Sequence, residues 1–198
     1  MIHNLTQRTS AWHQIRLGKV TGSRMKTIFS SNNLPLIYEL IAEEISQSWD
    51  ETFVSAAMQR GIDLEPLARE AYCYTTGREI HDFGFITSDE LPYIGVSPDG
   101  ATSDLTHAIE IKCPDTKNHV AYLATKQLPK EYQYQALTYF IAIPQLQSLD
   151  FVSYDPRFSI KALHILTITR EEMQLPTHLP EILKFREKWL KYLRQICF

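Results

Sequence analysis

The sequence predicts a mixed α/β (α+β) fold in which helices flank a group of strands. Three observations lead to this prediction. Residues 107–113 alternate between apolar and polar side chains, which is the period of a half-buried strand. Residues 149–154 and 161–168 are also apolar or alternating, and they are joined by a short turn. Residues 54–76 and 170–196, in contrast, are long segments with helical character.

The composition is that of an ordinary globular protein. Of the 198 residues, 44% are hydrophobic and 22% are charged, so we expect one domain spanning residues 1–198. The net charge of −3 lacks the basic excess usual in nucleic-acid binders, so a DNA partner would require positive charge concentrated on one surface. No run of about 18 apolar residues is present, and we expect no contact with a membrane.

The N-terminal segment and the cysteines indicate a cytoplasmic protein without a disulfide framework. Residues 1–10 are polar and lack the apolar core of a signal peptide. Cys73, Cys113 and Cys197 are odd in number and widely spaced, which matches neither a disulfide scaffold nor a zinc or iron–sulfur site. We expect them to be small packed residues.

Seven helices are predicted from apolar spacing and end signals. In chain order they are residues 10–16, a helix beginning near Thr21 or Ser23, and residues 36–49, 54–76, 116–124, 129–143 and 170–196. Ser10 and Thr116 are the expected N-caps of their helices. A polar break at residues 50–52 precedes the fourth helix, which should kink at Pro66 and end at Gly77.

The apolar face of the last helix is expected to contain four residues, namely Leu183, Trp189, Leu190 and Leu193. Five strands are predicted between the helices, at residues 79–86, 93–96, 108–112, 149–154 and 161–168. The first three of these strands are expected to form an antiparallel meander.

Two short stretches, residues 95–100 and 107–113, concentrate the side chains that are capable of chemistry. On the alternating strand, Glu110 and Lys112 share one face about 6 to 7 Å apart. Asp99 lies in a Pro-Asp-Gly turn eleven positions before Glu110, which is enough chain to return beside it. Two carboxylates on neighbouring strands form a hard oxygen site for Mg²⁺ or Mn²⁺, and the backbone carbonyl of Ile111 could supply a further ligand.

A lysine beside such a metal can orient an attacking water and offset charge that develops on a phosphorane-like transition state. Phosphodiester hydrolysis is the reaction that needs this set of groups. The alternative is a hairpin whose Glu110 and Lys112 lie on a solvated face. For the Glu-Ile-Lys segment alone we favour that alternative, but the Ser-Pro-Asp-Gly segment ahead of it favours the metal site.

A possible phosphate site precedes these stretches. Thr21 and Ser23 lie near the start of a predicted helix, and a helix N-terminus with hydroxyl groups can bind an anion. Arg16 lies seven residues before Ser23, close enough for its guanidinium to share the same phosphate. The alternative is a surface arginine next to a capping serine.

Two predicted helices carry further polar candidates. Glu65, Arg69 and Tyr72 are spaced to share one helix face, so Glu65 either points toward the metal site or pairs with Arg69 on a solvated face. In the functional interpretation Glu65 binds the metal through water or accepts a proton. Tyr132 and Gln135 also share a face, which lines either a cleft or the core.

Taken together, these segments resemble the lambda-exonuclease (YqaJ-like) family of phage-type alkaline exonucleases, within the PD-(D/E)XK nuclease superfamily. The matching segments follow the family's order over about residues 10 to 140, and they are residues 12–16, 21–23, 60–66, 97–100, 110–114 and 132–135. The resemblance implies a PD-(D/E)XK restriction-endonuclease-like core with a central mixed β-sheet flanked by helices.

The resemblance also implies roles for the residues of the central site. Asp99 and Glu110 would bind Mg²⁺, and Lys112 would assist the attacking water. Glu65 and Gln135 would complete the site.

A second group of implied roles concerns the DNA end. Arg16, Ser23 and Ser97 would form a pocket for the 5′-phosphate. The family degrades one strand of a duplex processively from its 5′ end and leaves a 3′ overhang for a single-strand annealing recombinase. Its members are similar in forming a ring-shaped homotrimer, and we expect this protein in the cytoplasm, encoded by a bacterial host or a prophage.

The leading hypothesis is therefore a Mg²⁺-dependent 5′→3′ exonuclease on double-stranded DNA. One alternative is a PD-(D/E)XK endonuclease of restriction or repair type, for which a terminal-phosphate pocket would be of no use. Another is a non-catalytic DNA-end-binding module, which would not need Asp99, Glu110 and Lys112. An iron–sulfur nuclease is disfavoured because three scattered cysteines cannot supply four ligands.

Overall fold

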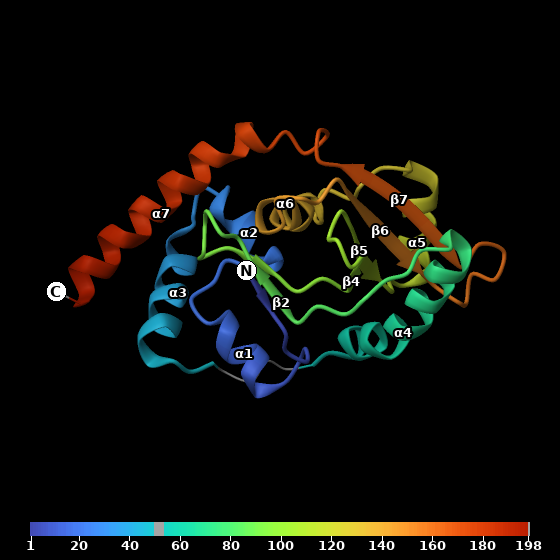
Figure 1. Ribbon diagram of the computed structural model, residues 1–198, viewed down its shortest axis with the longest axis horizontal. Helices are drawn as coiled ribbons and strands as arrows, with labels where there is room; N and C mark the ends of the chain where they lie inside the picture. Colours follow the sequence, from blue (N-terminus) through green and yellow to red (C-terminus); the bar gives the residue numbers. More distant parts are fainter. Residues whose placement is uncertain (50–53, 198) are drawn as a thin grey trace.

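The computed structural model describes residues 1–49 and 54–197, and its centre is a four-stranded mixed sheet (Figure 1). The strands lie in the order β4 (Gly100–Ala101), β5 (His107–Lys112), β6 (Ser148–Tyr154) and β7 (Leu163–Thr169). β5 runs parallel to β6, whereas the β4–β5 and β6–β7 pairs are antiparallel. The prediction of a mixed sheet flanked by helices is confirmed.

A second sheet contains β1 (Ile2–His3), β2 (Phe85–Thr87) and β3 (Gly95–Val96), all antiparallel. The predicted meander of three strands is wrong in its last step, since β3 and β5 belong to different sheets. β5 instead pairs with β4 on one side and β6 on the other. The alternating pattern predicts that a strand has a buried face, but it contains no information about which strand lies beside it.

The seven predicted helices are all present. They are α1 (Ser10–Arg16), α2 (Gly22–Ile28), α3 (Leu34–Ser46), α4 (Ala56–Thr76), α5 (Thr116–Thr125), α6 (Gln133–Ala142) and α7 (Leu175–Cys197). The N-caps of α1 and α5 lie one residue earlier than predicted, at Thr9 and Asp115, whose side chains accept bonds from backbone N–H groups of the first turn. The predicted polar break at residues 50–52 lies outside the described residues.

The end of α4 follows the prediction. Pro66 lies inside the helix, and Gly77 takes the left-handed conformation, with φ 67°, that terminates it. No helix of residues 1–49 and 54–197 is both long and apolar enough to cross a membrane.

α6 is the central helix of the molecule, and it lies between α2 and the four-stranded sheet (Figure 1). Tyr139 and Phe140 pack with Phe151 of β6, while Leu137 and Ile141 pack among α2, α3 and α7. All side chains from residues 136 to 142 are buried, which holds the helix in one orientation. Gln135 is therefore fixed just before a fully buried segment.

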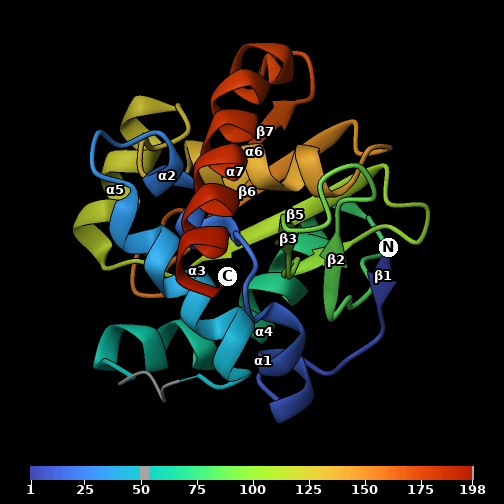
Figure 2. The same cartoon turned by 90° about the vertical axis from the view of Figure 1, so that its left-hand side faces the viewer.

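α7 runs beside α3 at one end of the molecule, as Figures 1 and 2 show. Its buried residues are Ile182, Phe185 and Trp189, which are spaced by three and four positions. Leu183 was predicted on this face but is 48% exposed, because it lies one position, or about 100°, around the helix from Ile182.

A buried polar network joins α4 to the start of β5 and to β6. The Tyr72 hydroxyl donates to Oδ2 of Asp150 at 2.7 Å and lies 2.9 Å from Nε2 of His107. Burial raises the pKa of Asp150, but hydrogen bonds from His107, Thr167 and Tyr72 outweigh it, so the net effect lowers that pKa. The network positions α4 against the strand that carries Glu110 and Lys112.

Candidate active site

The turn before β4 brings Asp99 to the edge of β5. Oδ2 of Asp99 accepts a hydrogen bond from the backbone N–H of Ile111 at 2.6 Å. Because the N–H and C=O of one strand residue face the same edge, the carbonyl of Ile111 also faces this edge. The structure therefore brings Asp99 and Ile111 together with Glu110, which is the next residue along the strand.

Glu110 is buried, and three side chains donate to its carboxylate. Oε1 accepts from Nε2 of Gln135 at 2.6 Å and from Nζ of Lys112, and Oε2 accepts from the Tyr139 hydroxyl at 2.5 Å. Tyr139 was not predicted as a site residue. Its position four residues after Gln135, on the same face of α6, was a signal that could have identified it.

The charges of the cluster are strongly coupled. Burial, followed by the charge of Glu110, raises the pKa of Asp99 well above its usual range. Burial lowers the pKa of Lys112, but the charges of Glu110 and Asp99 outweigh this and raise it, so the side chain is an ammonium. One cation thus faces two carboxylates in a poorly solvated site, an arrangement that favours binding of a further cation.

The donor set fits Mg²⁺ or Mn²⁺ held partly by other molecules. Within residues 1–49 and 54–197, no group of three or more His, Cys, Asp and Glu side chains is placed to hold a metal ion. Asp99, Glu110 and the Ile111 carbonyl remain as oxygen donors at one edge. Mg²⁺ is commonly bound through one or two carboxylates, with waters and substrate phosphates completing its coordination.

Glu65, on α4, has a different partner from the predicted one. Its Oε2 accepts from Nη2 of Arg8 at 2.7 Å, whereas Arg69 bonds to Asp82 and to the carbonyl of Ile80. The predicted Glu65–Arg69 pair is therefore wrong. The charge of Glu65 still contributes to raising the pKa of Asp99, which shows that it acts electrostatically on the acidic site.

Arg16 and Ser97 lie in direct contact. Nη1 of Arg16 donates to Oγ of Ser97 at 3.0 Å, and Nε1 of Trp12 donates to the same oxygen at 2.8 Å. The guanidinium carbon of Arg16 lies 3.8 Å from the centre of the Trp12 ring, so Trp12 holds both partners. Burial lowers the pKa of Arg16 to about 10, which leaves it charged at neutral pH.

Ser23 lies in the first turn of α2, with its hydroxyl oxygen 3.3 Å from that of Thr21. Among the described residues no hydrogen bond joins Ser23 to Arg16. The neighbouring Arg24 is occupied by ion pairs with Glu39 and Glu43. Ser23 is thus not bonded directly to the Arg16–Ser97 pair.

Gly22 permits α2 to pack closely against α6. A Cβ atom on Gly22 would lie 2.8 Å from Cγ of Gln135 and 3.6 Å from its Cα. A contact of 2.8 Å is too short for carbon atoms, so a side chain here would displace Gln135. The glycine of the Thr-Gly-Ser segment therefore positions a residue that binds Glu110.

We expect Gly22→Ala to lower kcat for DNA cleavage roughly tenfold, because displacing Gln135 weakens one hydrogen bond to a charged group. Gly61→Ala is the matched control, since nothing lies within 4 Å of a Cβ at that helical position. kcat would be measured at saturating duplex. Gln135→Ala should produce a similar loss, and the two changes together should not add. An unchanged kcat in Gly22→Ala would contradict this role.

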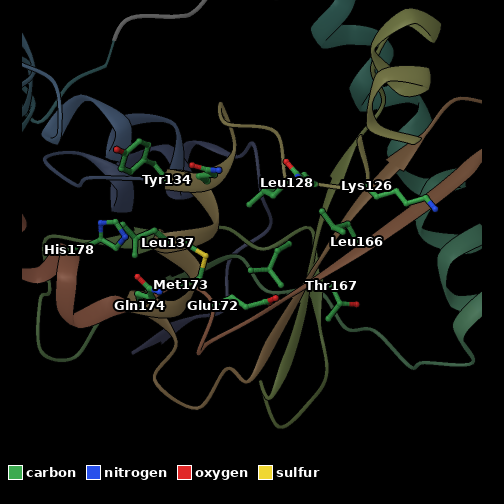
Figure 3. Close-up of a pocket in the computed structure, with 13 residues that line it drawn as sticks. Lys126, Leu128, Tyr134, Leu137, Leu166, Thr167, Glu172, Met173, Gln174 and His178 are labelled. Atoms are coloured by element: carbon green, nitrogen blue, oxygen red, sulfur yellow. The ribbon is translucent and has the colours of Figure 1, made fainter. Parts of the chain in front are cut away.

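A separate cavity of about 500 Å³ lies between α6, β7 and the start of α7 (Figure 3). Tyr134, Leu166, Met173 and His178 are among its lining residues. None of the predicted site residues lines it. Gln135, the residue after Tyr134, instead bonds to Glu110.

Comparisons with known proteins agree with this geometry. The family model of the YqaJ-like viral recombinase domain matches residues 11–142. The crystal structure of an alkaline exonuclease, LHK-Exo from Laribacter hongkongensis, is 32% identical, with a TM-score of 0.86 and coverage of 95% of this chain and 96% of that chain. The same enzyme in complex with dAMP gives the same values.

A phage-related exonuclease from Haemophilus somnus 129PT shares the fold, with a TM-score of 0.59 at 16% identity over 98% of this chain and 96% of that chain. No curated protein sequence matches this chain significantly.

Proposed function

Because this chain belongs to the YqaJ-like viral recombinase domain family, we propose that it is a Mg²⁺-dependent 5′→3′ exonuclease degrading one strand of linear double-stranded DNA. Family membership and the likeness to an alkaline exonuclease make it a nuclease that acts on DNA. One observation carries the finer proposal. Ser97, which binds Arg16, and Asp99, which binds the Ile111 N–H, are joined only by the buried Pro98. A phosphate held at Arg16 therefore lies close to the acidic site.

In this proposal Asp99, Glu110 and the carbonyl of Ile111 hold the metal ion. When bound, Mg²⁺ supplies Lewis-acid stabilisation of the charge on the phosphoryl oxygens. The ammonium of Lys112 orients the attacking water and offsets negative charge that develops in the transition state. Gln135 orients the Glu110 carboxylate.

Tyr139 and Glu65 support the same cluster. Burial and the charges of Glu110 and Asp99 raise the pKa of Tyr139 well above its usual range, so its hydroxyl remains a proton donor to Glu110. Glu65 acts as a proton acceptor, or binds the metal through water, once DNA occupies the site. Its charge already acts on Asp99.

The 5′→3′ polarity follows from the Arg16 pocket. A terminal 5′-phosphate carries close to two negative charges, one more than an internal phosphodiester. Arg16, held by Trp12 and Ser97, binds it through charge-assisted hydrogen bonds, and the Ser23 hydroxyl approaches from α2. The dAMP bound by LHK-Exo is a nucleoside monophosphate, the product expected when one nucleotide is released from a 5′ end.

Digestion from the 5′ end leaves a 3′ overhang for recombination. We further propose a ring-shaped homotrimer around the duplex, with a single-strand annealing recombinase as the partner that receives the overhang. The cytoplasm of a bacterial host or prophage carrier is the compartment that this reaction requires. These proposals rest on the family membership.

The test compares wild type with Arg16→Ala on linear duplex bearing a 5′-phosphate or a 5′-hydroxyl, and on closed circular DNA. Wild type should digest the phosphorylated end fastest, leave the circle intact and stop in EDTA. Arg16→Ala should digest in shorter runs and lose most preference for the phosphorylated end. Product lengths from an end-labelled duplex, under single-encounter conditions, provide the measurement.

Arg78→Ala serves as the control, because Arg78 is an exposed arginine beyond the end of α4. Cleavage of the closed circle would favour an endonuclease. Binding to ends without cleavage in Mg²⁺ would favour a non-catalytic module. Unchanged run length and end preference in Arg16→Ala would contradict the phosphate pocket.

A further inference from the structure

A second arginine, Arg60 of α4, reaches the candidate site, and we propose that it binds an internal backbone phosphate of the DNA strand being degraded. Nη2 of Arg60 lies 3.4 Å from the carbonyl oxygen of Cys113, the residue after Lys112. The guanidinium therefore lies at the C-terminal end of β5, beside the strand segment that carries the acidic cluster. α1, which carries Arg16, and α4 lie on the same side of the molecule in both views (Figures 1 and 2).

The ion pairs of the other arginines distinguish Arg60 from them. Arg8, Arg24, Arg69 and Arg157 each form an ion pair with a carboxylate. In the part of the chain that the structure describes, no carboxylate lies within ion-pair distance of Arg60. Its charge is thus available to a ligand, whereas the charges of those four arginines are compensated within the protein.

The hydrogen-bonding groups of Arg60 are also incompletely used. Its Nε is buried and has no hydrogen-bond partner within the described residues, and the 3.4 Å contact to Cys113 is long for a hydrogen bond. A buried donor without a partner is destabilising, so such a group usually has an external ligand or another function. The guanidinium presents donors in a planar fork that matches two oxygens of a phosphate.

The charge of Arg60 acts on the candidate site. Burial, followed by the charges of Glu65 and Asp99, raises the pKa of Cys113 to about 11, while the charge of Arg60 acts in the opposite direction. Positive charge at this point lies beside two carboxylates, where a polyanionic backbone would otherwise be repelled. Arg60 thus supplies part of the local positive surface that the overall charge of −3 does not provide.

The inference rests on the proposed function in treating this edge of β5 as the path of DNA. It differs from the role of Arg16 in the phosphate that is bound. Arg16 would hold the terminal 5′-phosphate, so its contribution depends on the end group. Arg60 would hold an internal phosphodiester, so its contribution should be equal for 5′-phosphorylated and 5′-hydroxyl ends.

The experiment measures binding of a fluorescent duplex in EDTA, where cleavage does not occur, over a range of salt concentrations. Arg60→Gln should weaken binding roughly tenfold at low salt, the scale of one hydrogen bond to a charged group. It should also lower the slope of log K against log salt by about 0.9, the contribution of one phosphate contact. Arg60→Lys should retain the slope, because it keeps the charge. A slope unchanged in Arg60→Gln would overturn the proposal.

Arg78→Gln is the matched control, and it should leave both affinity and slope unchanged. Arg78 lies 18 residues after Arg60, or about 27 Å if the helical rise of 1.5 Å per residue is continued. A second measurement uses the unmodified protein, so it does not depend on the folding of a variant. Phenylglyoxal modification of Arg60, quantified by mass spectrometry, should fall on adding duplex while that of Arg78 does not. Equal modification of Arg60 with and without DNA would overturn the proposal.

The two proposals fail in different ways. A wild-type chain that binds duplex with an Arg60-dependent salt slope but never cleaves it would overturn the exonuclease and leave the Arg60 contact standing. A chain that cleaves from 5′ ends with an unchanged slope in Arg60→Gln would do the reverse.

Discussion

Asp99→Asn and Glu110→Gln are each expected to reduce cleavage of linear duplex below detection, while binding to duplex ends largely survives. The described residues provide only two clustered carboxylates with one backbone carbonyl, so neutralising either carboxylate removes a charged ligand that water cannot replace electrostatically. Asp99→Asn keeps an oxygen that can accept from the Ile111 N–H, so the turn should remain folded.

Single-turnover cleavage in Mg²⁺ and duplex binding in EDTA separate the two effects. Asp63→Asn is the control, because Asp63 is an exposed aspartate on α4 that bonds only to Gln59 among the described side chains. Cleavage close to the wild-type rate in either variant would show that the hydrolytic site is elsewhere in the chain.

Lys112→Ala is expected to lower kcat by a factor of at least about 10², the scale of losing one preorganised electrostatic group. The Lys112 ammonium donates to Glu110, and it is held in the charged state by Glu110 and Asp99 despite burial. Lys112→Arg should not restore the rate, because a planar guanidinium cannot take the place of a compact ammonium in this confined cluster.

The measurement is kcat at saturating duplex, with Lys184→Ala as a control at an exposed lysine of α7. Binding should change much less than kcat in Lys112→Ala, since the proposed role lies in the transition state. Full activity in Lys112→Arg would mean that Lys112 only balances the charge of the carboxylates.

Local patterns predicted most of the secondary structure. The limits of α1 and the end of α4 at Gly77 followed from caps, periodicity and breakers, which act over a few residues. β6 and β7 were recognised with their connecting turn for the same reason. The N-caps at Thr9 and Asp115 were each missed by one residue, because adjacent polar residues compete for the capping position and the sequence does not rank them.

The pairing of strands was beyond the reach of local patterns. β5 resembled the last strand of a meander, yet its parallel neighbour β6 comes later in the chain, after α5 and α6. The choice of neighbour depends on how α6 packs between the sheet and α2, a contact between segments distant in sequence. In α7 the same kind of contact selected the face with Ile182 and Phe185 over that with Leu183.

For the candidate site, the sequence by itself determined which residue types are present and where they fall along the chain. Asp99, Glu110 and Lys112 were recognisable because two carboxylates and a lysine at strand spacing have few chemical uses. Arg16 and Gln135 gained their interpretation from the family resemblance.

Only the tertiary structure decided the partners of these residues. It placed the Tyr139 hydroxyl on Glu110, Trp12 on Ser97, Gly22 against Gln135, and Arg8 rather than Arg69 on Glu65. The physical reason is that a hydrogen bond or ion pair requires two side chains within about 3 Å, and the chain path that achieves this is set by the packing of the whole core. A sequence lists the donors and acceptors, whereas the fold selects which of them meet.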